Sequence, residues 1–199
     1  MVIAAIVSVV PMKFGPPESP KHVPPAPTDP FCVSRSQLFV NDGTGRFRDV
    51  SADNAALCGG PTVARALAVG DVDNDGALDL LVTRVGGSPL LLRNRAPRRG
   101  NWLMVRAIDP RLRRDAYGAE VRVRAGDRSW VRWVNPAYSY LASCDPRAHF
   151  GLGPAEHFDR LRVTWPDGLA EEFPGGAVNR LLEVRRGEGT PAEQEGPGR

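Results

Sequence analysis

Four aspartates fall within nine consecutive residues, in the segment Asp71-Val-Asp-Asn-Asp-Gly-Ala-Leu-Asp79. Counted from Asp71, they occupy positions 1, 3, 5 and 9, and a glycine occupies position 6. Calcium takes roughly six to eight oxygen ligands at about 2.3–2.6 Å, and closely spaced aspartates on a tightly turning backbone can supply most of them. The segment is therefore predicted to form a calcium-binding loop.

The predicted ligands are four carboxylates and one main-chain carbonyl, which belong to Asp71, Asp73, Asp75 and Asp79 and to Ala77. Gly76 lacks a Cβ, so it can take the positive φ of a sharp turn at little steric cost. The alternative is a turn that holds no ion, since Asp, Asn and Gly dominate turns for reasons unrelated to metals. Four clustered carboxylates repel one another without a cation, which favours the metal.

The residues on either side of this loop decide which kind of calcium site it is. An EF-hand needs a bidentate Glu at position 12, where this chain has Val82. The flanking segments Ala66-Leu-Ala-Val69 and Leu78-Asp-Leu-Leu-Val-Thr83 are short, apolar and partly β-branched, which is typical of strands. The loop is therefore predicted to join two strands.

Length and composition set the outer limits. The 199 residues suit one or two domains, and a hydrophobic content of 42% is enough for a packed core. The net charge is +3, but the basic residues are scattered, and the short cluster of Arg111, Arg113 and Arg114 is expected to be a solvated loop. No nucleic-acid partner is predicted.

The three cysteines, Cys32, Cys58 and Cys144, show no CxxC spacing, which argues against a zinc site. A disulfide between Cys32 and Cys58 would form in an oxidising compartment, whereas buried free thiols are the alternative. Both possibilities stay open at this point.

The two ends of the chain differ in composition from its middle. Residues 1–10 are almost entirely apolar but are too short to span a membrane as a helix, so we expect a strand there and no stable membrane insertion. Seven prolines between Gly15 and Pro30 indicate a linker. We assign residues 1–35 to this apolar segment and linker, and residues 187–199 to a disordered tail.

A weak internal repeat suggests a propeller architecture. Leu38-Phe-Val-Asn41 recurs 53 residues later as Leu91-Leu-Arg-Asn94. Periods of this size are typical of propeller blades, in which each unit buries its apolar faces against its neighbours. Asp42-Gly-Thr-Gly45 indicates a hairpin turn between strands. Residues 36–97 are therefore predicted to form a calcium-binding repeat.

Residues 98–186 are predicted to form a second, compact β domain. Val121–Arg124, Trp130–Val134 and Arg160–Trp165 carry apolar and charged residues in short alternating or mixed runs, which fit strands with one buried face. Gly126-Asp127 and Pro166-Asp-Gly168 supply turns. The chain is thus expected to be all-β, with a partial propeller blade followed by an antiparallel β-sandwich or barrel-like domain.

His149 is the best candidate for catalysis, because Ser139, Ser143 and Asp145 lie near it in the sequence. Composition alone does not make a triad, and a nucleophile-elbow sequence is missing. We predict that His149 is a structural residue bonded to the backbone, and we assign no catalytic residue.

Four tryptophans, Trp102, Trp130, Trp133 and Trp165, are expected mainly to pack the core, with a sugar-stacking platform as the alternative. Trp130 and Trp133 have opposite strand parity, so at most one of them is expected to face the core. The other is the residue to test for a ligand surface.

Two groups of motifs resemble known families. Leu38-Phe-Val-Asn-Asp-Gly-Thr-Gly-Arg-Phe47, the aspartate loop and Leu90-Leu-Leu-Arg-Asn94 resemble FG-GAP (VCBS-type) repeats, which build β-propellers and bind calcium in their Asp-rich loops. Asn101-Trp-Leu-Met-Val105, Tyr117-Gly-Ala-Glu-Val121, His149-Phe-Gly-Leu-Gly153 and Val163-Thr-Trp-Pro-Asp-Gly168 resemble the ASPIC/UnbV domain. The usual Gly-x-Gly-Tyr stretch of that domain is missing between Asn135 and Cys144.

The combination resembles the C-terminal part of longer, secreted proteins of the cartilage acidic protein-like family. This resemblance implies a calcium-binding, non-enzymatic, extracellular or periplasmic interaction or adhesion module. Its implied partners are an unknown protein or glycan and the missing blades of a propeller. The alternatives are an enzyme or accessory protein of bacterial natural-product biosynthesis, and a glycan-binding module.

Overall fold

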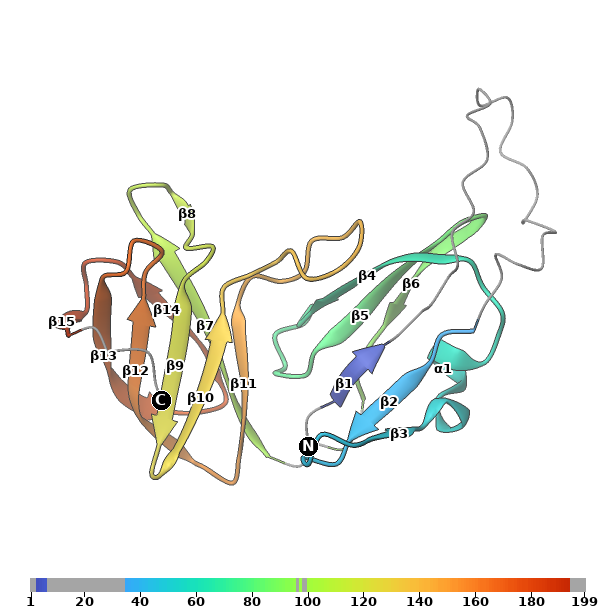
Figure 1. Ribbon diagram of the computed structural model, residues 1–199, viewed down its shortest axis with the longest axis horizontal. Helices are drawn as coiled ribbons and strands as arrows, with labels where there is room; N and C mark the ends of the chain where they lie inside the picture. Colours follow the sequence, from blue (N-terminus) through green and yellow to red (C-terminus); the bar gives the residue numbers. More distant parts are fainter. Residues whose placement is uncertain (1–2, 7–34, 96, 98–99, 194–199) are drawn as a thin grey trace. The chain divides into compact units, whose positions relative to one another are not determined.

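The computed structural model of the protein describes residues 3–6, 35–95, 97 and 100–193 (Figure 1). Strands make up 53% of the chain and helices 4%, which confirms the predicted all-β class. The chain divides into two compact units. The first contains residues 1–68, 79–93 and 140–142, and the second contains residues 69–78, 94–139 and 143–199.

Two three-stranded sheets make up most of the first unit. One sheet has the order β1 (Ile3–Ile6), β2 (Leu38–Asn41) and β3 (Phe47–Asp49), and the other has the order β4 (Ala64–Gly70), β5 (Asp79–Arg84) and β6 (Gly87–Leu92). A short 3₁₀ turn (Ser51–Asp53) and the one-turn helix α1 (Ala55–Cys58) follow β3. The buried residues Leu57, Cys58 and Val82 form the small core of this unit.

The predicted hairpin turn lies between β2 and β3. The amide of Asp42 donates to the Arg46 carbonyl at 3.0 Å, and the amide of Thr44 donates to Asp42 Oδ1 at 2.8 Å. Gly43 and Gly45 have φ values of 92° and 90°, which side chains rarely adopt. The glycines at these positions thus permit the tight reversal that the sequence predicted.

The second unit contains one five-stranded and one four-stranded sheet. The larger sheet is antiparallel and has the order β10 (Arg128–Trp133), β9 (Glu120–Ala125), β12 (His157–Thr164), β13 (Ala170–Ala177) and β15 (Thr190–Ala192). The smaller sheet has the order β11 (Ala148–Gly153), β7 (Asn101–Asp109) and β14 (Arg180–Arg185), with β8 (Arg114–Asp115) paired to β7. Figure 1 shows these strands in two layers.

Alternate residues from both sheets form one core. Its fully buried members include residues from β7, β9, β11 and β12, namely Leu103, Val105, Val121, Val123, Phe150, Leu152, Leu161 and Val163. The intervening residues point to the outer faces, because side chains alternate along a strand. Neither sheet closes on itself within the described ranges, so the domain is a sandwich rather than a barrel.

The structure differs from the sequence-based expectations at two places in this domain. Strand β14 pairs with β7 in parallel, with Leu182 opposite Val105, so the sandwich is not purely antiparallel. The expectation of a disordered tail was wrong for residues 187–193. Strand β15 pairs with β13, and the amides of Gly187 and Gly189 donate to the carboxylate of Glu171. These backbone hydrogen bonds order a segment whose composition is typical of disorder.

Two tryptophans lie as their strand parity predicted. Trp130 is partly buried and packs against the core, whereas Trp133 is 60% exposed. Cys58 and Cys144 are buried, and Cys32 lies outside the described residues, so its pairing stays a prediction. The same holds for the linker between Gly15 and Pro30. None of the described helices has the length and apolarity that crossing a membrane would require.

Candidate metal site

The aspartate loop connects two strands, as predicted. Asp71 directly follows Gly70, the last residue of β4, and Asp79 is the first residue of β5. Val82, at the position where an EF-hand carries its Glu, lies in β5 and is 5% exposed. The flanking strands thus exclude an EF-hand, which needs a helix on either side of its loop.

Three of the predicted ligands come together. One carboxylate oxygen each from Asp71, Asp73 and Asp79 lies within 4.8 Å of the other two. Ligands on opposite sides of a calcium ion are about 5 Å apart, since each Ca–O distance is about 2.3–2.6 Å. The three oxygens therefore fit the coordination sphere of one calcium ion. Asp75 is not a member of this group, and its Oδ1 accepts a hydrogen bond from the Ala77 amide at 2.8 Å.

Asp71 holds the loop in shape. Its Oδ1 accepts from the amide of Asp75 at 3.0 Å, and its Oδ2 accepts from the amide of Gly76 at 2.7 Å. Asn74 and Gly76 take left-handed conformations, with φ values of 57° and 87°. Asparagine and glycine tolerate this region better than other residues, so the loop sequence matches its backbone.

Burial makes the negative charge of this loop costly. Asp71 and Asp79 are each 3% exposed, and Asp73 is exposed. A buried carboxylate is costly unless hydrogen bonds and an opposite charge compensate for its lost hydration. Two buried acidic groups within coordination distance of each other therefore favour a bound cation.

Arg147 links the loop to the sandwich and supplies part of the compensating charge. Its Nη2 donates to the main-chain carbonyl of Asp71 at 2.9 Å, and its Nη1 donates to Asn74 Oδ1 at 2.5 Å. The guanidinium also binds the carboxylate of Asp145, with Nε at 2.8 Å from Oδ2. The Asp145 hydrogen bond raises the pKa of Arg147. The charge of Arg147 is therefore shared between Asp145 and the loop.

Gly76 rests on the outer face of the four-stranded sheet. A Cβ at this position would overlap the indole ring of Trp102, a residue of β7. Nε2 of His149, in the neighbouring strand β11, donates to the Gly76 carbonyl at 2.9 Å. The Trp102 and His149 rings are nearly parallel, at 9°, with their centroids 6.4 Å apart. The Trp102 ring and the His149 hydrogen bond thus form a seat for Gly76, and a residue with a Cβ at this position would collide with Trp102.

The backbone hydrogen bond predicted for His149 is present. Burial lowers the pKa of His149, and the hydrogen bond to Gly76 opposes this shift only in part. The neighbouring carboxylate of Asp145 bonds to Arg147 rather than completing a triad. Sequence reasoning missed Arg147 and Trp102 as supports of the loop, because nothing in the spacing links them to it.

Comparisons with known proteins agree with this architecture. A family model described as FG-GAP-like repeat matches residues 28–82, and one described as ASPIC and UnbV matches residues 109–191. The second match ends within β15, in agreement with the ordered end of the sandwich.

The chain is similar to cartilage acidic protein 1 of two vertebrates. It is 35% identical to the Homo sapiens protein over 127 residues, which are 58% of this chain and 18% of that protein. It is 34% identical to the Xenopus tropicalis protein over 128 residues, which are 59% of this chain and 19% of that protein. The chain thus spans about a fifth of the length of these relatives. Two segments of the chain thus match, in order, an FG-GAP-like repeat and an ASPIC and UnbV domain.

Proposed function

We propose that the protein is a calcium-stabilised, non-enzymatic interaction module of an extracellular or periplasmic protein. One observation carries the calcium assignment. Three carboxylates of one loop, two of them buried, place oxygens within 4.8 Å of one another. Calcium is the preferred ion, because clustered carboxylate oxygens on a flexible turn suit a hard cation with many ligands.

Asp75 and the carbonyl of Ala77 are the remaining proposed ligands. Both lie in the same nine-residue segment as the three clustered carboxylates. A bound cation would neutralise the acidic groups and fix the loop between β4 and β5. Because the unfolded chain has no preformed site, binding adds directly to the stability of the fold.

The proposed location and role rest on the family. The relatives are named cartilage acidic protein 1, and the combined domains resemble those of secreted proteins. An adhesive or binding role is supported by the exposed aromatic side chains of Trp133 and Tyr138, which are 60% and 58% exposed. Aromatic residues on a surface are typical of recognition sites. The engagement of His149 with Gly76 favours binding over catalysis.

Thermal melts of Asp73→Ala test this proposal. Asp73 is the exposed member of the cluster, so its loss is not expected to unfold the protein. In millimolar calcium, the wild-type chain should melt several degrees higher than in chelator, with magnesium giving a smaller rise and about one ion bound by calorimetry. Asp73→Ala should lose most of this difference.

Asp53→Ala is the matched control, because Asp53 is also exposed but lies outside the loop. It should keep the full calcium response. A folded wild-type chain whose melting temperature is the same in calcium and in chelator would show that the loop is an inert turn.

A further inference from the structure

Four arginines form a square on the outer face of the five-stranded sheet. Arg122 and Arg124 lie on β9, and Arg160 and Arg162 lie on the neighbouring strand β12. The register places Arg160 opposite Arg124, and Arg162 opposite Arg122. Residues between them on both strands, such as Val123 and Leu161, are fully buried in the core. All four arginine side chains therefore start from the same outer face.

This arrangement has an electrostatic cost. Opposed residues on antiparallel strands have Cα atoms about 4.5–5.5 Å apart, and like charges there are destabilising. Two glutamates compensate in part. Glu172 Oε1 lies 3.1 Å from Arg160 Nη1 and 3.8 Å from Arg162 Nη1, and Glu120 Oε1 lies 3.0 Å from Arg122 Nη2. Nε of Arg124 donates to the Gly126 carbonyl, a neutral group. Positive charge therefore remains in excess on this face.

A cavity of about 260 Å³ opens over the square. Its lining consists of five arginines, two carboxylates and one serine, namely Arg122, Arg124, Arg128, Arg160, Arg162, Asp127, Glu172 and Ser129. The formal charge of this lining is +3. Arg162 is 9% exposed, whereas Arg124 and Arg160 are exposed. The cavity is slightly smaller than pockets for drug-sized ligands, which start at about 300 Å³. It suits one charged group of a longer molecule.

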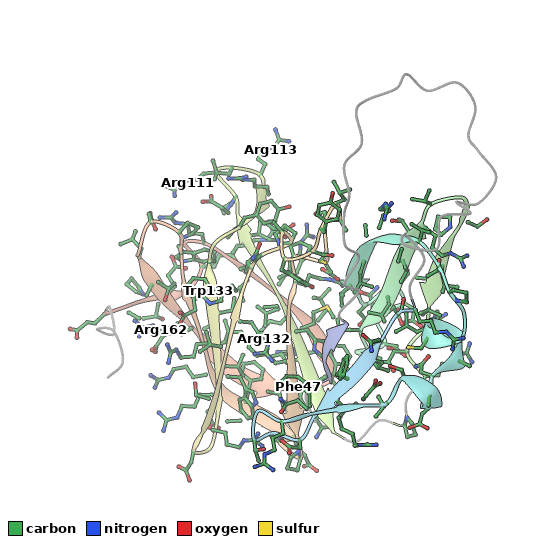
Figure 2. All side chains as sticks on the ribbon, turned by 45° about the vertical axis from the view of Figure 1, so that its right-hand side comes forward. Phe47, Arg111, Arg113, Arg132, Trp133 and Arg162 are labelled. Atoms are coloured by element: carbon green, nitrogen blue, oxygen red, sulfur yellow. The ribbon has the colours of Figure 1, made fainter. Side chains whose placement is uncertain are left out.

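Trp133 extends this surface along the edge strand β10. It lies opposite Glu120, which is on the same face of β9 as Arg122 and Arg124. Residues two apart on a strand are roughly 7 Å apart. The distance from Trp133 to the nearest arginine of the square is therefore about the length of one or two sugar rings. Figure 2 shows Trp133 and Arg162 on this sheet, apart from Arg111 and Arg113 on the loop between β7 and β8.

We propose that this face binds an acidic polysaccharide, with a sulfate or carboxylate group in the arginine cavity and a sugar ring on Trp133. Planar guanidinium groups match the oxygens of such groups in pairs, and an exposed indole offers a flat apolar face to a sugar ring. The inference rests on the proposed interaction role, whose partner class it names. It does not involve the aspartate loop.

Nucleic acid is a poorer match for the same surface. Nucleic-acid-binding faces carry basic side chains in long stripes that follow the phosphate backbone. Here the cavity is short, and Glu120, Asp127 and Glu172 interrupt the positive charge. A localised anionic group beside an aromatic ring fits a substituted sugar better.

The test compares two double variants that remove the same charge. R124Q/R160Q removes two exposed arginines of the square, and R111Q/R113Q removes two exposed arginines of the β7–β8 loop. Binding to immobilised dextran sulfate and to polygalacturonate is measured in 0.15 M salt, roughly physiological ionic strength, with calcium and with chelator. R124Q/R160Q should lose about tenfold or more in affinity, and the control about threefold or less. Trp133→Ala should lose about threefold or more.

The two polymers separate sulfate from carboxylate as the preferred group, and unsubstituted dextran reports binding to sugar alone. Retention of binding in chelator would separate this inference from the calcium proposal. Absence of binding to both charged polymers by a folded chain would overturn it. Equal losses in the two double variants would do the same, because they would indicate net charge alone. Tighter binding to duplex DNA, or no effect of Trp133→Ala, would overturn the saccharide assignment.

Discussion

The aspartate loop and the arginine square concentrate charge in two different ways. In the loop, three carboxylate oxygens converge within 4.8 Å, because consecutive residues on a tight turn can point to one place. On the sheet, the arginines are held apart by strand spacing, at roughly 5 Å across the strands and 7 Å along them. Turn geometry therefore suits a single ion, whereas strand geometry suits a larger ligand with several acceptor oxygens.

The two regions also differ in what holds them. The loop is fixed by hydrogen bonds to its own backbone and by a seat on Trp102 and His149. The arginine square is fixed by the register of β9 and β12, whose opposite face forms the core. Substitutions in the loop should therefore affect stability strongly, and substitutions of exposed arginines should affect it little.

Gly76→Ala should produce the largest effect. The new Cβ would overlap the Trp102 indole, and φ is 87°, so we expect a loss of about 3 kcal/mol in the free energy of unfolding. Urea denaturation followed by tryptophan fluorescence measures this loss, because all four tryptophans lie in the second unit.

Gly126→Ala is the control for Gly76→Ala, because its φ is 56° but the space around it is open. A loss of about 1 kcal/mol is expected there. Equal losses would show that the seat on Trp102 contributes nothing.

Arg147→Gln should have a smaller effect. It removes the ion pair with Asp145, whose side chain is 16% exposed, and the hydrogen bond to the Asp71 carbonyl. A loss of about 2 kcal/mol is expected in chelator, since a largely buried carboxylate would lose its partner. Arg111→Gln breaks an ion pair of 3.6 Å in which the arginine is 67% exposed. It should cost less than about 0.5 kcal/mol, because Asp109 keeps its ion pair with Arg186 at 3.5 Å and its hydrogen bonds from two backbone amides. The same urea experiment compares the two, and similar losses would contradict a special role for Arg147.

Arg124→Gln should have the smallest effect, with the opposite sign. Removing one of two directly opposed cations relieves repulsion, so we expect a gain of about 0.3 kcal/mol at low salt that disappears at about 0.5 M salt. The measurement is the melting temperature at the two salt concentrations. Destabilisation that is independent of salt would show that Arg124 packs rather than repels.

The sequence was informative where the relevant residues are neighbours in the chain. Local spacing accounts for the clustering of Asp71, Asp73 and Asp79, for the strands that flank their loop, and for the opposite faces of Trp130 and Trp133. The seat of Gly76 does not, because His149 is 73 residues away and comes into place only through the pairing of β11 with β7.

The arginine square could not be predicted for the same reason. On each strand the two arginines alternate with buried apolar residues, and this pattern is visible in the sequence. However, β10 and β11 separate β9 from β12 in the chain. Only the register shows that the pairs face each other. The tail was misjudged because its Gly, Glu and Pro content is typical of disorder, while its order comes from hydrogen bonds to Glu171 and β13.

The residues that support the aspartate loop, Trp102 and His149, are synthesised after the loop itself. His149 leaves the ribosome 70 residues after Asp79, which takes about 4–14 s at about 5–20 residues per second. Strand β14, which completes the sheet beside β7, follows later still. During that interval the nascent loop has its acidic residues but lacks the surface that shapes them. The proposed calcium site would therefore reach its full affinity only after β11 has been synthesised and has paired with β7.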